Sequence, residues 1–292
     1  MKKFISNSVI KFYSRAQVII SGALVFGLFQ FPFLPNIQPS NLLKKDAAQA
    51  ESLLKESEPF ELTGLFFGPE VKENVANQIV LDKMAYVSSR NAYPASLAVI
   101  KKHANTIKTF AREKGVPEDV ALGVSLLENG GSETAVSSAG ALGVFQLMPG
   151  TARSLGLTVN KKMDERKDPK KNIEAGITYL KTNHERFGDW GLATWAYHAG
   201  EGNVSKAVKL YAQATHKITL KGAKDPKSMR EYIEKYNVTI HKLLSSPAVK
   251  TLTKKLNDDS EGYPYKVLAT ASLFREAQHQ SAVSSGDVLS NR

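Results

Sequence analysis

The chain has 292 residues, of which 42% are hydrophobic and 23% charged, and it carries a formal net charge of +11. These values indicate one globular domain of roughly 150–200 residues with flanking segments, and argue against a fibrous or wholly disordered chain. Because cysteine is absent, disulfides, thiolate metal sites and a cysteine nucleophile are excluded. The positive charge favours anionic partners. Since no basic stripe is interleaved with aromatic residues and no groove-binding motif is present, we expect no binding to nucleic acid.

Residues 1–40 have the pattern of an export signal, in which an apolar run over residues 18–34 follows basic residues at Lys2, Lys3, Lys11 and Arg15. Gln30 and Pro32 leave the run marginal for a permanent span of about 20 residues. A small-x-small cleavage site ends at Ala50, unusually far beyond it. The segment is therefore predicted to be either a cleaved signal peptide or an uncleaved anchor in the inner membrane, with a buried core helix as the alternative. We expect the remainder to be exported to the periplasm or cell envelope.

Residues 41–96 are predicted to form a linker and an N-terminal extension, to which the sequence assigns no role. From Leu97 to about residue 278, apolar residues recur at helical spacings and no useful strand alternation appears. The fold class predicted for residues 97–278 is therefore mostly α. The serine-rich residues 279–292 are predicted to be a disordered tail.

One helix in this region ends on a carboxylate. Pro117 is suited to open a helix, and Glu118 and Asp119 favour its positive end. The pair Gly130-Gly131 ends it, which places Glu128 in the last turn of a buried helix.

Further helix starts follow along the chain. Asp168 before Pro169 is a capping aspartate followed by a first-turn proline. Asp189 is expected to cap a helix over residues 190–199 that stops at Gly200. Other helices are predicted near residues 151–155, 203–214, 227–244 and 264–278.

Three segments in order resemble one known family: ENGGSETAVSSAGALGVFQLMPGTA (128–152), DPKKNIEAGITYL (168–180) and ATWAYHAGEGNV (193–204). The chain resembles the soluble lytic transglycosylase (SLT) family, which belongs with goose-type lysozymes. The match covers roughly residues 97–212, with its motif core at 117–212 and an echo near 263–269. It implies a lysozyme-like helical domain with a glycan-binding cleft. Three family positions are changed here, to Asn129 from Ser, Phe145 from Met and His198 from Asn.

The resemblance implies a reaction as well as a fold. Glu128 would be the acid–base residue of a lytic transglycosylase acting on peptidoglycan glycan strands, cleaving between N-acetylmuramoyl and N-acetylglucosamine units and leaving a 1,6-anhydromuramoyl end. A proton donor of this kind must stay protonated near neutral pH, and burial at a helix C-terminus raises a carboxyl pKa in the required direction. No cofactor or metal is implied, and the six histidines lack metal-ligand spacing.

The substrate contacts implied by the resemblance are Asn129, Phe145, Gln146, Tyr197, His198 and Tyr265. Phe145 could stack on a sugar ring, while Gln146 could bind a sugar amide or brace its own loop. His198 is either a substrate contact or structural. Either Tyr263 or Tyr265 could align with the tyrosine that closes the cleft in this family.

Two other functions remain open from the sequence. A goose-type muramidase would cut the same bond with water, and Glu133 could then serve as a second carboxylate, although an exposed turn residue is the blander interpretation. An inactive peptidoglycan-binding module would need neither residue, but the chain retains Glu128.

Overall fold

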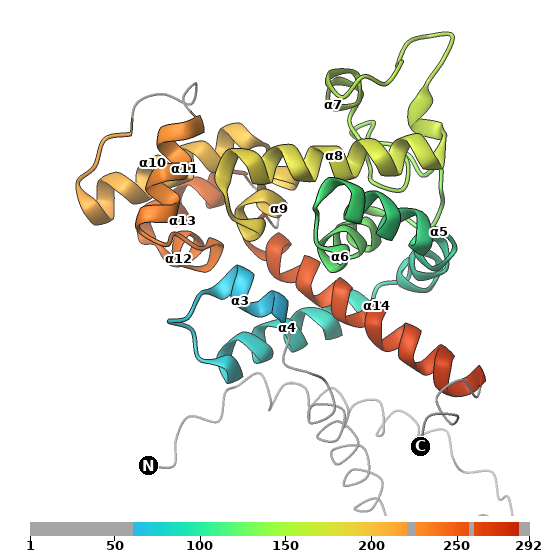
Figure 1. Cartoon of the computed structure of the whole chain (residues 1–292), viewed down its shortest axis with the longest axis horizontal. Helices are drawn as coiled ribbons and strands as arrows, with labels where there is room; N and C mark the ends of the chain where they lie inside the picture. The colour runs from blue at the N-terminus through green and yellow to red at the C-terminus, as the bar shows by residue number, and fades with distance from the viewer. Residues whose placement is uncertain (1–60, 221–225, 257–259, 286–292) are drawn as a thin grey trace, which may run out of the picture. The chain divides into compact units, whose positions relative to one another are not determined.

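The computed structural model describes residues 61–220, 226–256 and 260–285, and within these ranges the chain is built of helices (Figure 1). They are α3 (Glu61–Phe67), α4 (Glu73–Ser88), α5 (Tyr93–Lys114), α6 (Glu118–Glu128), α7 (Pro149–Ser154), α8 (Pro169–Phe187), α9 (Trp190–Ala199), α10 (Glu201–His216), α11 (Pro226–Lys235), α12 (Ile240–Ser245), α13 (Pro247–Leu256) and α14 (Tyr263–Ser285), with short 3₁₀ turns at Glu165–Lys167 and Ser260–Gly262. Extended pairing in these ranges is limited to isolated β-bridges. The predicted mostly α fold class is confirmed.

Local sequence signals set the helix ends that matter for the site. Pro117 precedes α6, whose last residue is Glu128. The Asp168 carboxylate accepts hydrogen bonds from the first-turn amides of α8, and the Asp189 carboxylate accepts one from the amide of Leu192 in α9. These side chains satisfy amides that have no partner inside a helix.

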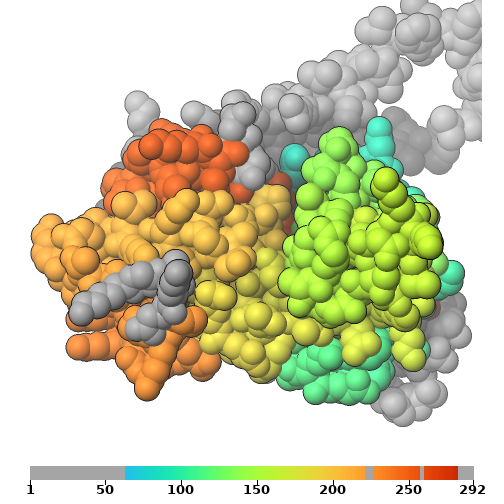
Figure 2. All heavy atoms as spheres, turned by 90° about the horizontal axis from the view of Figure 1, so that it is seen from above, coloured from blue at the N-terminus to red at the C-terminus, as the bar shows by residue number. Residues whose placement is uncertain are grey.

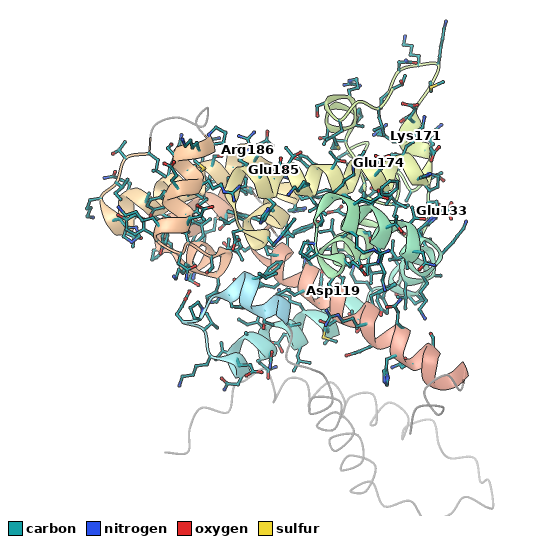
Figure 3. All side chains as sticks on the ribbon, viewed as in Figure 1. Asp119, Glu133, Lys171, Glu174, Glu185 and Arg186 are labelled. Carbon is teal, nitrogen blue, oxygen red and sulfur yellow. The ribbon has the colours of Figure 1, made fainter. Side chains whose placement is uncertain are left out.

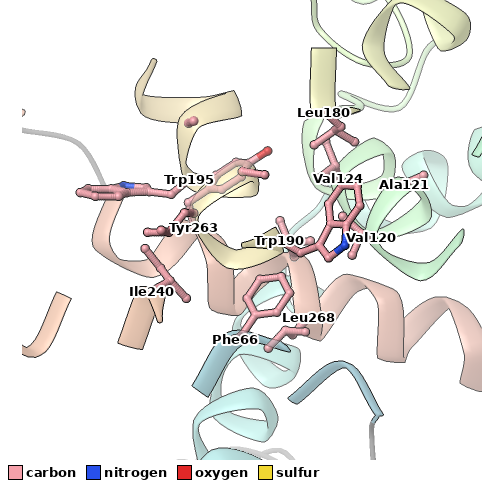
Figure 4. Close-up of a cluster of buried hydrophobic side chains, with 14 of the residues drawn as sticks. Phe66, Val120, Ala121, Val124, Leu180, Trp190, Trp195, Ile240, Tyr263 and Leu268 are labelled. Atoms are coloured by element: carbon pink, nitrogen blue, oxygen red, sulfur yellow. The ribbon is translucent and has the colours of Figure 1, made fainter. Parts of the chain in front are cut away.

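The core is organised around α14, which packs mainly against α6 and α4 (Figure 1). Gly123 permits the close approach of α6, because a Cβ at this position would lie 2.4 Å from the carbonyl oxygen of Val267. Thr270 on α14 donates a hydrogen bond to the Gly123 carbonyl at 2.7 Å. Figure 4 shows the apolar cluster at this crossing, which includes Val124 and Leu268. Each large aliphatic side chain buried there stabilises the fold by roughly 1.5–3 kcal/mol.

The compact unit extends beyond the boundaries predicted from sequence. It begins near residue 60 rather than 97, because α3 and α4 pack on α14 and carry Phe66 and Phe67 into the core. At the other end, α14 continues to Ser285, so residues 279–285 are helical rather than a disordered tail. Gly68 and Pro69 break this segment into short apolar runs, so the hydrophobic periodicity did not reveal α3 and α4.

The predicted helix over 227–244 is broken in two. Asn237 has a positive φ of 47°, which stops α11, and Thr239 then caps α12 by accepting a hydrogen bond from the amide of Lys242. Within the described ranges no helix is long and apolar enough to cross a membrane. The predicted N-terminal signal or anchor lies outside these ranges.

Candidate active site

Glu128 ends α6 and is half-buried, with its carboxylate held by a tyrosine from another helix. The hydroxyl of Tyr263, the first residue of α14, donates a hydrogen bond to Glu128 Oε1 at 2.6 Å. Desolvation raises the pKa of Glu128 to about 7, and the hydrogen bond from Tyr263 opposes part of this rise. The carboxyl group therefore holds its proton over part of the neutral range, as a general acid must.

Tyr263, and not Tyr265, occupies the position beside Glu128. The Tyr265 hydroxyl lies 3.0 Å from His241 Nδ1, and its ring stacks on Phe67 with centroids 5.3 Å apart. Residues two apart on a helix point in nearly opposite directions, at about 100° per residue, so only one of the two tyrosines can face Glu128. The structure therefore places Tyr263, rather than the predicted Tyr265, beside Glu128.

Two residues of α9 join the same group. The exposed His198 ring stacks on Tyr263, with centroids 4.3 Å apart and planes inclined by 13°. The Tyr197 hydroxyl donates a hydrogen bond to the carbonyl of Phe145 at 2.6 Å, and its ring packs against Tyr179. The structure thus brings Glu128, Tyr263, His198 and Tyr197 together from three helices.

Residues 129–168, between α6 and α8, form what we call the loop lobe, and two buried side chains hold it together. Asn172 is 0% exposed; it accepts a hydrogen bond from the amide of Phe145 and donates to the carbonyls of Leu142 and Arg166. The Arg166 guanidinium pairs with Asp164, and it also donates to the carbonyls of Gly140 and Leu147 at 2.8 Å each. These bonds satisfy a charge that would be costly to bury alone.

Three predicted substrate contacts turn out to support this lobe. Phe145 is 0% exposed and packs against Gly176, so its side chain is core and cannot stack on a sugar. The Asn129 side chain is buried and accepts from the amide of Gly131 while donating to the carbonyl of Ser132. Gln146, at a positive φ of 45°, donates through Nε2 to the carbonyls of Ala135 and Gly143. All three side chains therefore have partners within the protein, which supports a role in holding the loop lobe together.

Glu133 is tied to α5 and differs electrostatically from Glu128. Its carboxylate forms an ion pair with Lys102 of α5 and lies 3.0 Å from Nε2 of His103 on the same helix (Figure 3). The hydrogen bond from Lys102 is the main cause that holds the pKa of Glu133 below its usual value. Glu133 is therefore ionised at neutral pH and unsuited to donate a proton.

A second carboxyl group with a raised pKa lies at the far end of α9. Desolvation raises the pKa of Asp189 to about 7, but Asp189 caps the start of the helix through the amide of Leu192. Since α9 has ten residues, its two ends are about 15 Å apart. The raised pKa of Asp189 reflects a buried helix cap, while His198 and Tyr263 lie at the opposite end of α9.

A pocket of about 320 Å³ opens between the segment after α7 and α8, and Glu128 is not part of its lining. Its charged lining consists of Glu165, Lys171 and Glu174. These charges are already paired within the protein, Glu165 with Lys171 and Glu174 with Lys114. We therefore place the candidate chemistry at Glu128 and not in this pocket.

The supporting roles of Arg166 and Asn172 were not predicted from the sequence. Asn172 lies inside the quoted DPKKNI segment, but only its burial and its three backbone partners reveal its function. Arg166 had no sequence signal, since a lone arginine beside lysines is usually solvated.

Comparison with known proteins identifies a family for the middle of the chain. Residues 105–219 match the family model described as Transglycosylase SLT domain. The chain is 25% identical over 173 residues to the membrane-bound lytic murein transglycosylase D of Escherichia coli, covering 58% of this chain and 38% of that protein. It is 35% identical over 104 residues to the transglycosylase of Enterobacteria phage PRD1, covering 36% of this chain and 37% of that protein.

The chain spans well under half the length of these curated relatives. Among solved structures, the 70 kDa soluble lytic transglycosylase of Escherichia coli aligns with a TM-score of 0.42 at 16% identity. That alignment covers 82% of this chain and 45% of the other.

We predict that Glu128→Gln stabilises the protein more at pH 8 than at pH 4. Because the folded-state pKa of about 7 exceeds the usual 4.5, the contribution of the protonated carboxyl is complete below about pH 4.5 and is lost as the pH rises through about 7. A neutral glutamine loses nothing. The difference from wild type should therefore grow by on the order of 1–3 kcal/mol between pH 4 and pH 8 in urea denaturation.

Glu133→Gln serves as the matched control, because its pKa is lowered and its replacement should bring no gain at pH 8. A difference between Glu128→Gln and wild type that is constant across this pH range would contradict the raised pKa.

Proposed function

Because residues 105–219 belong to the transglycosylase SLT domain family, we propose that this chain is a peptidoglycan lytic transglycosylase with Glu128 as its acid–base residue. The bond cleaved is the β-1,4 linkage between N-acetylmuramoyl and N-acetylglucosamine units. The observation that carries the proposal is the half-buried Glu128 carboxyl, with its pKa raised to about 7 and bonded to Tyr263.

In the proposed reaction Glu128 acts first as an acid and then as a base. Its carboxyl proton passes to the glycosidic oxygen as the bond from C1 of the N-acetylmuramoyl unit breaks. The carboxylate then takes the proton of the C6 hydroxyl, whose oxygen attacks C1 and closes a 1,6-anhydro ring. The proton balance closes on Glu128 and no water is consumed. General acid–base catalysis of this kind contributes about 10²–10⁴-fold to the rate.

Tyr263 positions the carboxyl group for both steps. Desolvation raises the pKa of the Tyr263 phenol well above its usual value, so the group stays a hydrogen-bond donor. A donor to the carboxylate stabilises the state that must act as base, while desolvation stabilises the acid. The substrate's own N-acetyl group would support the cation-like centre, because substrate-assisted glycosidases dispense with a second carboxylate.

We propose that the substrate contacts two parts of the protein. One is the exposed ring of His198, which stacks on Tyr263, and the other is the loop lobe, whose backbone Gln146 supports. The proposed setting is the cell envelope. Relatives named membrane-bound lytic murein transglycosylase support this setting. The basic N-terminal segment with its apolar run supports export, by a cleaved signal or by an anchor in the inner membrane.

The alternative function is that of a muramidase, and the contacts of Glu133 argue against it. A hydrolase that needed a second carboxylate would draw on Glu133, which is instead paired with Lys102 and His103. An inactive binding module would not require the pKa of a helix-end glutamate to be raised at the expense of stability.

We predict that the full chain releases glycan fragments with 1,6-anhydromuramoyl ends from purified peptidoglycan and that Glu128→Gln does not. Glu133→Gln is the matched control and should give the wild-type products, because the Glu133 carboxylate is paired with Lys102 of α5. The ends are identified by mass spectrometry.

Reducing muramic ends would instead establish hydrolysis. Absence of cleavage by the wild type, with binding to the glycan intact, would reassign the chain as a binding module.

We predict that Tyr263→Phe shifts the alkaline limb of the pH–activity profile to higher pH. The substitution removes the hydrogen bond that lowers the pKa of Glu128, so the carboxyl holds its proton further into the alkaline range, while the ring remains to stack on His198. Tyr265→Phe, two residues away and bonded to His241, should leave the limb in place. Equal shifts in both variants would refute the proposed coupling of Tyr263 to Glu128.

A further inference from the structure

The loop lobe and the first turn of α8 carry lysines that the acidic residues of the same segment cannot neutralise. The segment from Arg153 to Lys171 has three acids, and each has a partner: Asp164 pairs with Arg166, Glu165 pairs with Lys171, and Asp168 caps α8. Four exposed lysines of the segment form no ion pair among the residues that the structure describes, namely Lys161, Lys162, Lys167 and Lys170. We call these four the lobe lysines.

The lobe lysines are held on an ordered framework. Lys161 and Lys162 occupy the tip of a turn in which the Asn160 side chain accepts hydrogen bonds from the amides of Lys162 and Met163. The amide of Asn160 donates to the carbonyl of Met163, and the bridge between Val159 and Asp164 closes the turn. Fixed positive charges bind an anionic ligand at a lower ordering cost than charges on a mobile loop.

The same framework reaches the candidate active site. Arg166, which precedes Lys167, donates to the carbonyls of Gly140 and Leu147, on either side of Gln146. Figure 2 shows the green and lime part of the chain, in which the loop lobe lies, as one block beside the yellow and gold part. A ligand on the lobe lysines and a glycan at Glu128 can therefore be parts of one molecule.

We propose that the lobe lysines bind the carboxylates of the peptides that peptidoglycan strands carry, so that the domain favours peptide-bearing glycan. This inference rests on the proposed function and specifies its substrate. Peptide carboxylates are separate point charges along a flexible chain, which suits single ammonium groups at the turn tip and at the start of α8. The net charge of +11 adds long-range attraction to the same anionic polymer.

An anionic membrane surface is a less suitable occupant. At the turn tip the large apolar side chain is Met163, 54% exposed, and it is flanked by lysines and by Asp164. Interfacial binding scales with buried apolar area as well as charge, and one methionine offers little. The lobe also begins at Asn129, directly after Glu128, which favours the substrate itself.

The test combines Lys161→Glu, Lys162→Glu and Lys167→Glu in the full chain, with Glu128→Gln added so that the glycan is not digested. The control carries Lys206→Glu, Lys250→Glu and Lys254→Glu on α10 and α13, which are exposed and form no ion pair in the described ranges. Both triple variants change the net charge equally. Binding is measured by co-sedimentation at 50 mM salt with intact peptidoglycan and with peptidoglycan whose carboxylates are blocked as neutral amides.

We expect the lobe variant to bind intact peptidoglycan roughly tenfold more weakly, since several modest ion pairs become repulsions, and the control to change little. Blocking the carboxylates should weaken binding of the parent more than binding of the lobe variant, because the variant keeps only the long-range attraction of its remaining net charge. Equal weakening in both triple variants would overturn the proposal in favour of net charge. Stronger lysine-dependent binding to phosphatidylglycerol vesicles than to peptidoglycan would overturn it in favour of lipid.

Activity separates this proposal from the function on which it rests. With Glu128 restored, the lobe variant should cleave glycan strands stripped of their peptides as fast as wild type, while cleaving intact peptidoglycan more slowly at limiting concentration. If wild type produced no glycan ends from either substrate, the proposed function would fail, whereas the binding comparison would still decide the role of the lysines. A lobe variant equal to wild type on both substrates and in binding would overturn the inference.

Discussion

The hydrogen bond from Tyr263 to Glu128 is the contact on which the rest of the site depends. It joins the last residue of α6 to the first residue of α14, so it exists only if these two helices cross in register. Gly123 allows the two helices to approach closely because it has no Cβ, and Thr270 holds them together by its hydrogen bond to the Gly123 carbonyl. The α14 packing that builds the core therefore also sets the environment of the proposed acid, and α3 and α4 contribute by covering α14.

The site also depends on the loop lobe, whose backbone is held by buried polar side chains in an otherwise apolar core. Arg166 and Asn172 together satisfy backbone groups on both sides of the loop that carries Phe145 and Gln146. Because every acid near Arg166 is used internally, the surplus charge of this segment faces outward as lysines. A single arrangement thus supports the glycan site and leaves a surface suited to anionic groups of the same polymer.

Local signals in the sequence predicted much of this, and long-range contacts account for what they missed. Local helix-start signals located α6, α8 and α9, and hence Glu128: a proline precedes α6, and aspartate side chains cap α8 and α9. The choice between Tyr263 and Tyr265 depends on the rotation of α14 against α6, which no local pattern encodes. The same holds for Phe145, whose burial against Gly176 is a tertiary contact, and for α3 and α4, whose apolar residues gain meaning only against α14.

The proposed function requires the Glu128 carboxyl to be protonated near neutral pH, and titration of this group tests that requirement most directly. Glutamate labelled with ¹³C at the side-chain carboxyl, with the Glu128 signal assigned by its loss in Glu128→Gln, gives the midpoint by NMR without any substrate. The structure predicts a midpoint of about 7. A midpoint near the ordinary value of 4.5 would mean that the carboxyl is solvated and ionised, and would contradict the proposed role of Glu128 as proton donor.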